Sequence, residues 1–319
     1  MATGKTGRVA KIWRDGELVN WEDANIHVIS HVAHYGSGVF EGIRAYETPQ
    51  GGAVFRLADH MRRLLDSCRI YRMPIEYTQD QLVQATVDAV AANDLRSCYI
   101  RPLVIRTGEQ MGFYPIGVPV ETFIICWRSE GPYLGHEAMA NGADVCVSSW
   151  RRAAPDTFPT LAKASGNYMN SQLSGIEARQ NGYSEAIVLD AFGFVSEGTG
   201  ENLFVVRNNV LYTSPIAAGI LEGITRATVI QLAKDRGLEV REQNIPREML
   251  YVADEMFFCG TAVEVTPVRS VDRVPVGSGA PGPITRAIQT EYLAMVGGRI
   301  PDRHGWLTPV PVAAGAGRA

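Results

Sequence analysis

A chain of 319 residues can bury a large core, and its length is typical of about two domains. Its charged fraction of 20% and hydrophobic fraction of 46% are those of an ordinary soluble globular protein. The net charge of −4 and the lack of any run of Lys and Arg argue against nucleic acid as a main partner, and no apolar stretch is long enough to span a membrane.

The first part of the chain predicts strands followed by two helices. Short apolar runs around Asp15-Gly16 indicate a hairpin, and "GIRAYETPQGGAVFR" indicates a second strand pair. Apolar residues at helical spacing from Leu57 to Tyr71 predict an amphipathic helix. A second helix is expected from Asp80 to Asn93, with Asp80 as its cap. "CYIRPLVIRTG" and "ETFIICW" follow as buried strands, joined by the loop "GEQMGFYPIGVP".

The second part mixes strands and helices without strict alternation, which favours an α+β fold over a doubly wound sheet. Its expected elements are the strand "ADVCVSSW", the helix "GNYMNSQLSGIEARQNG", a hairpin of two buried strands at Ala186–Leu189 and Leu203–Val206, the helix "ITRATVIQLAKDRG", the strands of "EMFFCGTAVEVTPVRSV" and the helix "PITRAIQTEYLAMVGG". We predict a small N-terminal domain over 1–130, a linker over 131–141, a large domain over 142–311 and a disordered tail over 312–319.

The cysteines and histidines give no sign of a disulfide frame or a metal site. The five cysteines are odd in number, scattered and never in a C-x-x-C pair, which favours a reduced, cytoplasmic compartment with buried thiols. His31 and His34 lie close together in "HVAHYG", but no other metal-ligand pattern accompanies them, so we expect both to be structural. The start of the chain lacks the apolar segment of a secretory signal.

The stretch "GFVSEGTGENLFVV" places two acids where a plain turn would not need them. Glu197 ends an apolar run, and Glu201 lies in the glycine turn that follows. A buried carboxylate is costly unless a cation faces it, so we expect a cation beside Glu197. The Gly-rich stretches match neither the dinucleotide fingerprint nor the P-loop, and no serine nucleophile elbow is present.

Two other features could serve a phosphorylated cofactor. Behind Gly223, the helix that begins near Ile224 offers free N–H groups, the Thr225 hydroxyl and its dipole to an anion. Lys163 has small, apolar neighbours in "PTLAKASGNY", which favour a lowered pKa and a Schiff base. Taken alone, Thr225 is an ordinary first-turn residue and Lys163 a surface lysine. Together with Glu197 they match the needs of pyridoxal phosphate, whose pyridinium would be the missing cation.

The sequence resembles the branched-chain amino acid aminotransferases, which have fold type IV of the pyridoxal phosphate enzymes. The resemblance runs nearly end to end, from "WEDANIHVISHVAHYGSGVFEGIRAYET" through "SCYIRPL", "SSWRRAAPDTFPTLAKASGNY", "VSEGTGENLF", "GITR" and "FFCGTAVEVTPVRSVD" to "GPITRAIQ". It implies a two-domain fold like that of D-amino acid aminotransferase, with a small N-terminal α/β domain and a larger C-terminal domain that carries a barrel-like sheet.

The resemblance also implies roles for individual residues. On the cofactor side these are Lys163 as Schiff-base lysine and proton shuttle, Glu197 at the ring nitrogen, Arg63, Ile224, Thr225 and Thr261 at the phosphate, Tyr168 at the phenolic oxygen and Leu221 against the ring face. On the substrate side they are Tyr99 and the amides of Thr261 and Ala262 at the α-carboxylate, Arg101 with the partner subunit's Tyr35 at the second carboxylate of glutamate, and Phe40, Gly42 and Tyr133 in the pocket wall. Arg44 lies near this site and receives no role.

Two departures from the family pattern bear on the substrate range, because a charged residue at the pocket rim either makes the rim more polar or turns outward. Glu130 stands where some members carry a tryptophan. Phe113 stands where other members can carry a smaller aliphatic residue, on a loop that reaches the pocket of the partner subunit. The shared pocket implies a homodimer at least.

The activity implied is a ping-pong transfer of the amino group from L-leucine, L-isoleucine or L-valine to 2-oxoglutarate. D-amino acid transaminase, (R)-amine transaminase and aminodeoxychorismate lyase share the lysine and the acid, and a non-catalytic binding protein could keep the fold. "YIRP" with "GTA" favours the branched-chain arrangement for L-substrates.

Overall fold

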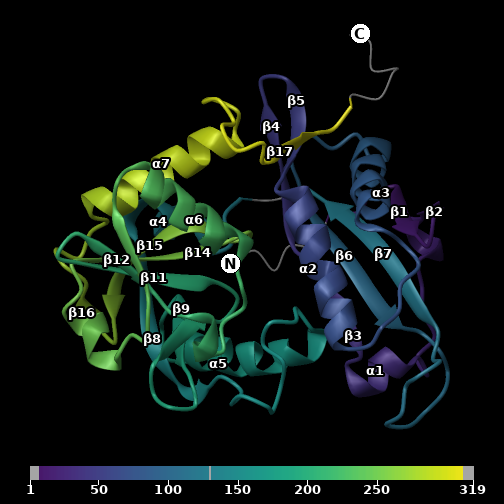
Figure 1. Ribbon diagram of the computed structural model, residues 1–319, viewed down its shortest axis with the longest axis horizontal. Helices are drawn as coiled ribbons and strands as arrows, with labels where there is room; N and C mark the ends of the chain where they lie inside the picture. The colour runs from purple at the N-terminus through teal and green to yellow at the C-terminus, as the bar shows by residue number, and fades with distance from the viewer. Residues whose placement is uncertain (1–6, 129–130, 312–319) are drawn as a thin grey trace. The chain divides into compact units, whose positions relative to one another are not determined.

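The chain forms two compact units in a computed structural model that describes residues 7–128 and 131–311. Unit 1 groups the described residues of Met1–Glu130, Ala162–Gly166 and Ala294–Ala319, and unit 2 groups those of Gly131–Leu161 and Asn167–Leu293 (Figure 1). The boundaries expected from the sequence differ from this division, because 162–166 and 294–311 belong to unit 1 and 131–141 belongs to unit 2. Glu130 and the tail 312–319 lie outside the described residues.

Unit 1 is built on an eight-stranded sheet whose described pairs are all antiparallel. The strand order is β17-β5-β4-β6-β7-β1-β2, and β3 also pairs with β6. Both expected hairpins, β1–β2 and β4–β5, are confirmed. The strands are β1 (Lys11–Arg14), β2 (Glu17–Asn20), β3 (Gly38–Phe40), β4 (Ile43–Thr48), β5 (Gly51–Phe55), β6 (Cys98–Arg106), β7 (Val120–Trp127) and β17 (Leu307–Pro309).

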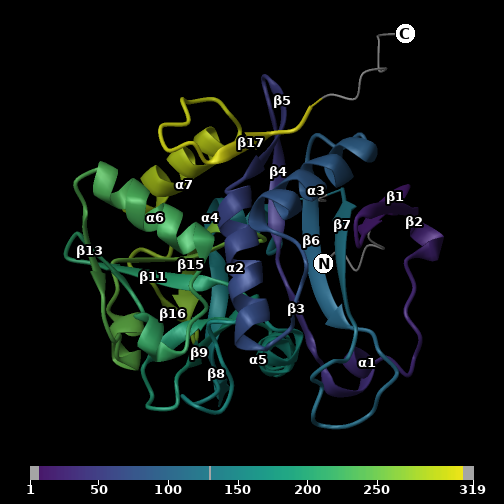
Figure 2. The ribbon, with the colours of Figure 1, turned by 45° about the vertical axis from the view of Figure 1, so that its right-hand side comes forward.

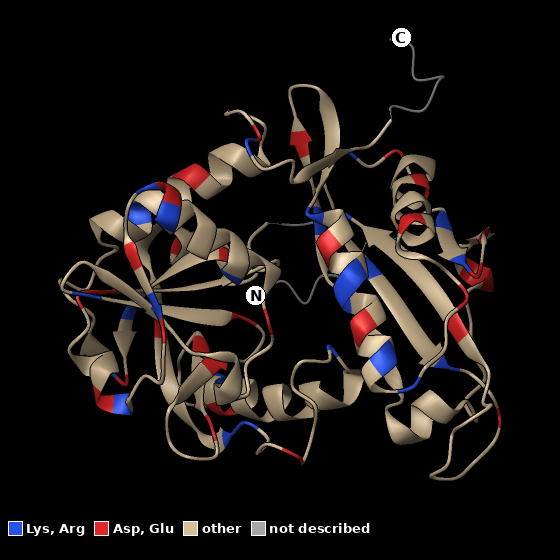
Figure 3. Cartoon of the chain, viewed as in Figure 1, with Lys and Arg blue, Asp and Glu red and all other residues tan. Residues whose placement is uncertain are grey.

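Two helices of unit 1 pack against each other and against this sheet (Figure 2). In α2 (Leu57–Ile70), Leu57, Met61 and Leu64 are fully buried, because the helical repeat brings them to one face. Acids and bases alternate along α2 (Figure 3). On its exposed side, Arg62 pairs with Asp66. The short helix α1 (His31–Tyr35) contacts β6.

The second helix, α3 (Gln79–Ala92), does not have the cap expected from the sequence. Asp80 lies in the first turn, and Thr78 is the N-cap instead. The Thr78 hydroxyl accepts a hydrogen bond from the Gln81 amide (3.3 Å), and the Gln81 side chain accepts one from the Thr78 amide (2.8 Å). This capping box satisfies two N–H groups, whereas Asp80 as cap would satisfy one.

Unit 2 is built on a nine-stranded mixed sheet that curls into a half-barrel, as expected. Its order is β10-β9-β8-β15-β14-β11-β12-β13, with β16 added to β15. The pairs β8–β9, β8–β15 and β12–β13 are parallel. The strands are β8 (Ala143–Arg151), β9 (Glu185–Leu189), β10 (Val195–Gly198), β11 (Asn202–Arg207), β12 (Val210–Thr213), β13 (Glu239–Glu242), β14 (Glu255–Gly260), β15 (Glu264–Val271) and β16 (Val274–Pro275).

The prediction that Ala186–Leu189 and Leu203–Val206 pair as a hairpin is wrong. β9 pairs with β10, and the apolar run Leu203–Val206 lies in β11, whose partners are β12 and β14. The turn that joins β9 to β10 is closed by a hydrogen bond from the Asp190 amide to the Phe194 carbonyl (2.7 Å). Because β10 contains Ser196 and Glu197, apolarity did not mark it as a strand.

Helices from several parts of the chain pack on the sheet of unit 2 (Figure 1). The helix α4 (Gly135–Asn141) contacts β15 and occupies most of the expected linker, so that segment is not an extended connection. The other helices are α5 (Tyr168–Gln180) on β8 and β9, α6 (Ile224–Asp235) on β13 and β14, and α7 (Pro283–Val296). Short 3-10 turns occupy Trp21–Asp23, Ser165–Asn167, Ile216–Ala218 and Arg247–Tyr251. Within the described ranges, no helix combines the length and apolarity that crossing a membrane requires.

The cysteines are buried, as expected, and the two histidines hold loops in place. All five cysteines are free and buried. His31 makes hydrogen-bond contacts with the Ser37 hydroxyl (2.7 Å) and the Gly112 carbonyl (3.0 Å), and His34 with the Val28 carbonyl (3.1 Å). Both rings therefore fasten loops of unit 1.

Candidate active site

Lys163 lies in an extended segment that belongs to unit 1. Its carbonyl accepts a hydrogen bond from the Phe40 amide (2.9 Å), and its amide donates to the Ser67 hydroxyl of α2 (3.0 Å). The next residue, Ala164, bridges to Val39 of β3. The Lys163 ammonium lies 5.1 Å from the centre of the Phe40 ring. The backbone of this lysine is thus fixed from both sides, independently of its side chain.

Aromatic rings surround Arg101 on β6. Its guanidinium carbon lies 4.5 Å from the ring centre of Phe40, 5.6 Å from that of Tyr99 and 5.7 Å from that of Trp127. Tyr99 and Trp127 stack with their centres 4.9 Å apart. The buried Nε of Arg101 has no hydrogen-bond partner among the described residues. The structure thus brings together three residues expected at the substrate, and it adds Trp127, which the sequence did not single out.

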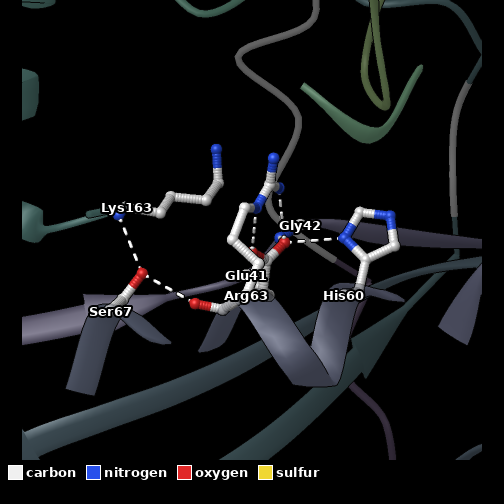
Figure 4. A network of polar contacts seen from close by, with 6 residues as sticks. All are labelled: Glu41, Gly42, His60, Arg63, Ser67 and Lys163. Carbon is white, nitrogen blue, oxygen red and sulfur yellow. Dashed lines mark hydrogen bonds and ion pairs between the residues drawn. The ribbon is translucent and has the colours of Figure 1, made fainter. Parts of the chain in front are cut away.

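A buried polar cluster lies beside Lys163, and we call Glu41, His60, Arg63 and Ser67 the arginine network (Figure 4). The Arg63 guanidinium donates twice to the Glu41 carboxylate, from Nε to Oε1 (2.6 Å) and from Nη2 to Oε2 (2.9 Å). His60 Nδ1 lies 2.7 Å from Oε2 of the same carboxylate. The Ser67 hydroxyl donates to the Arg63 carbonyl (2.9 Å). The sequence pointed to Arg63 alone.

The charges of the arginine network follow from its burial and its partners. Burial raises the pKa of the Glu41 carboxyl, but the Arg63 charge and the His60 contact outweigh burial and hold the pKa far below its usual range. Burial lowers the pKa of His60, and the Arg63 and Lys163 charges lower it further, against the opposing effect of Glu41. Glu41 is therefore an anion, and His60 is neutral and donates its Nδ1 hydrogen.

In unit 2, Glu197 is held by a set of donors that we call the carboxylate group (Glu197, Arg152, Asn202 and Leu221). Arg152 Nη2 lies 2.7 Å from Glu197 Oε1. Oε2 accepts hydrogen bonds from the Asn202 side-chain amide and from the Leu221 N–H, both at 3.0 Å. A protein cation therefore faces Glu197. The expectation that a cofactor ring supplies the missing cation did not foresee Arg152, although it lies in the quoted motif "SSWRRAAP".

Asn202 connects the carboxylate group to the start of α6. Its amide also donates to the Leu221 carbonyl (3.0 Å), and its side chain lies against Gly223, the N-cap residue of α6. A Cβ at Gly223 would overlap the Asn202 side-chain oxygen, so a larger residue there would displace Asn202. The helix starts at Ile224 as expected, and Ile224 and Thr225 are buried in its first turn.

The other expected residues of unit 2 lie in the turn between β14 and β15, at the start of α5 and in the segment before α4. Thr261 and Ala262 form the turn between β14 and β15, and the Ala262 carbonyl accepts a hydrogen bond from the Tyr133 amide (3.1 Å). Tyr168 is the first residue of α5 and is half-buried. This geometry brings Tyr133 and Ala262 together.

Two expected residues of unit 1 are exposed to solvent in the single chain. Phe113 is 93% exposed and Tyr35 38%, and their ring centres lie 5.5 Å apart in an edge-to-face contact. Arg44 is buried in β4. Glu130 lies outside the described residues, so its expected effect on the substrate range stays a prediction.

Glu201, the second acid of the glycine turn, is buried in unit 2. Oε2 accepts a hydrogen bond from the Gly200 amide (3.0 Å), and Oε1 has no hydrogen-bond partner among the residues described. Burial raises the pKa of Glu201 well above its usual range, and the nearby Glu185 charge raises it further. The folded protein therefore holds this proton to higher pH than an exposed glutamate does.

Replacing Glu201 with glutamine is expected to stabilise the protein at neutral and alkaline pH. A raised pKa favours the folded state below the unfolded pKa, and this stability is lost as pH rises toward the folded pKa. Glutamine keeps the neutral shape and removes that loss, which we expect to be on the order of 1–3 kcal/mol. The difference in unfolding free energy between Glu201→Gln and wild type, determined at pH 5 and at pH 8, measures this loss. Glu248→Gln, at an exposed position, is the control. A pH-independent difference between the Glu201 variant and wild type would contradict this expectation.

Comparison with known proteins identifies the family. The family model of the class IV aminotransferases (Amino-transferase class IV) matches residues 38–271. The branched-chain-amino-acid aminotransferase of Salmonella typhimurium is 51% identical over 305 residues, which cover 96% of this chain and 99% of that protein. The crystal structure of the Escherichia coli branched-chain amino acid aminotransferase superposes with a TM-score of 0.92 at 50% identity, covering 95% of this chain and all of that one. The T.th. branched-chain amino acid aminotransferase, complexed with N-(5'-phosphopyridoxyl)-L-glutamate, gives 0.90 at 42% identity, with 96% and 100% covered. The chain therefore belongs to the class IV aminotransferases.

Proposed function

We propose that this protein is a pyridoxal phosphate-dependent aminotransferase that moves the amino group of L-leucine, L-isoleucine or L-valine to 2-oxoglutarate by a ping-pong mechanism. Its full-length similarity to branched-chain aminotransferases supports the activity. The phosphopyridoxyl-glutamate complex of the T.th. relative supports both the cofactor and the amino-group acceptor.

The donor groups present fit the proposed cofactor. An aldehyde needs an amine, and Lys163 offers one on a fixed backbone. A protonated ring nitrogen needs an anion, and Arg152 and two N–H donors keep Glu197 in that form. A phosphate needs cations and N–H donors, which Arg63 and the first turn of α6 at Ile224 and Thr225 can supply.

The remaining contacts follow the family resemblance. We propose Thr261 as a further phosphate contact, Tyr168 at the phenolic oxygen and Leu221 at the ring face. Tyr99, Thr261 and Ala262 bind the α-carboxylate of the substrate.

In the proposed mechanism the protein supplies attachment, a proton carrier and charge stabilisation. Bound pyridoxal phosphate withdraws electrons from the substrate Cα, which makes the Cα proton acidic. Lys163 Nζ removes that proton and returns it to the carbon atom that accepts it. Glu197 stabilises the positive charge at the ring nitrogen, and Arg63 and Thr225 hold the phosphate end. The second half-reaction runs the same steps in reverse with 2-oxoglutarate.

The observation that carries the substrate proposal is the setting of Arg101. Phe40, Tyr99 and Trp127 give an apolar wall around one guanidinium whose buried Nε lacks a hydrogen-bond partner among the described residues. Such a wall suits an aliphatic side chain, and the cation suits the second carboxylate of glutamate. One pocket could therefore serve both substrates.

The test is a substrate panel with 2-oxoglutarate as acceptor, run on wild type and on Arg101→Met. We expect wild type to prefer L-leucine, L-isoleucine or L-valine to D-alanine and (R)-1-phenylethylamine. Methionine keeps the apolar wall and removes the charge, so the KM for 2-oxoglutarate should rise about 10- to 100-fold while that for L-leucine changes little. A preference for the D-amino acid or the amine would refute the proposed specificity, and an equal effect on both substrates would refute the role of Arg101.

Gly42 is expected to tolerate no side chain. A Cβ at this position would overlap the hydroxyl of Tyr99, and contact with its ring would also be too close. Gly42→Ala should therefore displace Tyr99 from the proposed α-carboxylate site and lower kcat/KM for L-leucine about 10- to 100-fold. Steady-state kinetics measure this, and Gly7→Ala, at a position with open space around it, is the control. An unchanged kcat/KM would contradict the assigned position of Tyr99.

We further propose a homodimer that shares its active sites, and a cytoplasmic location. The exposed rings of Phe113 and Tyr35 support the first, because large apolar groups on a surface favour association. The five free, buried cysteines support the second.

A further inference from the structure

We propose that Glu41 and His60 are positioning residues that fix the orientation of Arg63 and thereby give this enzyme its preference for a phosphorylated cofactor. This inference rests on the proposed function, in which Arg63 contacts the cofactor phosphate. All the contacts that carry it lie within unit 1 (Figure 4).

The contacts of the Arg63 guanidinium fix its orientation. A guanidinium has five N–H donors in one plane. Glu41 takes the edge formed by Nε and Nη2, at 2.6 and 2.9 Å. Two parallel hydrogen bonds on one edge fix both the plane and its rotation. The donors that Glu41 does not engage are thereby directed away from it.

Glu41 itself has little freedom to move. Its side chain is fully buried, and its Oε2 also accepts hydrogen bonds from His60 Nδ1 (2.7 Å) and the Gly42 amide (3.2 Å). Its own amide donates to the Pro102 carbonyl of β6 (2.8 Å). The carboxylate is therefore held by the sheet on one side and by α2 on the other, so it can act as a rigid support.

The helix α2 connects this support to Lys163. His60, Arg63 and Ser67 are spaced three and four residues apart on α2, which brings them to one side of the helix. Ser67 receives the hydrogen bond of the Lys163 amide and donates to the Arg63 carbonyl. Figure 4 shows the Lys163 and Arg63 side chains extending to the same side of α2. One helix thus sets both the attachment point and the arginine.

The charge of Glu41 does not explain its position beside Arg63. A carboxylate beside a phosphate-binding arginine repels the phosphate, so Glu41 cannot be explained as an aid to electrostatic attraction. Its two-point contact favours orientation as the role. A purely structural ion pair between α2 and the sheet is the competing explanation, and it predicts no difference between phosphorylated and unphosphorylated cofactor.

The test measures binding of pyridoxal phosphate and of pyridoxal to the full chain after removal of its cofactor, by visible absorbance. The variants are Glu41→Gln, His60→Asn and Arg63→Gln, with Glu47→Gln as control, because Glu47 forms an exposed ion pair in the same unit. Glutamine keeps one acceptor for Nε, but its amide hydrogens face the Nη2 donor, so Arg63 must turn. The 31P chemical shift of the bound phosphate reports that turn directly.

We expect Glu41→Gln to lower the preference for pyridoxal phosphate over pyridoxal at least about tenfold, with pyridoxal affinity nearly unchanged. His60→Asn should lower it less, in the same direction, and Arg63→Gln should lower it most. Glu47→Gln should leave it at the wild-type value. The 31P shift should move in Glu41→Gln and not in the control.

Equal loss of both affinities in Glu41→Gln would overturn the proposal in favour of a structural ion pair, and a raised preference would overturn it in favour of simple charge repulsion. If Glu41→Gln does not fold, His60→Asn decides, and an unchanged preference there overturns the proposal. An unchanged preference in Arg63→Gln would also overturn it, with the phosphate role of Arg63. Wild type that binds neither compound would instead refute the proposed function.

Discussion

Replacing Lys163 with alanine is expected to lower kcat for amino-group transfer by at least about 10⁴-fold, because the variant loses both the attachment of the cofactor and the proton carrier. The fold should survive. The backbone contacts of this residue with Phe40 and Ser67 do not involve its side chain, and the bridge at Ala164 keeps the segment on the sheet.

Single-turnover reaction with L-leucine and the visible absorbance of the purified protein measure this effect. Wild type should be yellow and should bleach irreversibly with borohydride, whereas the variant should hold no borohydride-fixed cofactor. Lys234→Ala, on the exposed side of α6, should behave as wild type. Near-normal turnover by the Lys163 variant would refute its assignment.

Replacing Glu197 with glutamine is expected to lower kcat about 10²- to 10³-fold, the usual effect of removing one preorganised electrostatic contact from an active site. The amide carries no charge, so it cannot stabilise a protonated ring nitrogen. Its –NH₂ group would also face either Arg152 or the donors of Asn202 and Leu221, which now contact the two carboxylate oxygens.

The matched control is Glu242→Gln. Glu242 also pairs with an arginine of unit 2, Arg226, at 2.7 Å, but it belongs to neither group of proposed active-site residues. Steady-state rates with L-leucine and the absorbance of the bound cofactor separate the two variants. If Glu197→Gln kept more than about a third of wild-type kcat, the proposed role of the carboxylate would not stand.

The sequence predicted elements well where the pattern is local. The helix α2 and the hairpins β1–β2 and β4–β5 depend on residues that are neighbours along the chain, and all three are confirmed. The pairing of β11 with β14 could not be predicted in this way. β11 pairs with β14, some fifty residues later, and an apolar run looks the same whichever strand it pairs with.

The candidate site divides in the same manner. Lys163 and Glu197 could be proposed because an amine among small residues and an acid after an apolar run together match the needs of one cofactor. Arg152 and Glu41 could not, because their meaning comes from contacts with distant residues, Glu197 and Arg63. One signal was available for Glu41, since it directly follows the fully buried strand β3.

Unit 1 contains segments from both ends of the chain, so it is completed late in biosynthesis. Its sheet is completed by β17, which pairs with β5, and β17 is among the last described segments of the chain. A ribosome releases unit 2 in full before it releases these residues. Until then the β5 edge lacks its neighbour, and an open edge invites pairing with other chains. A chain shortened to end before Leu307 would keep every residue of the proposed site and still carry that open edge permanently.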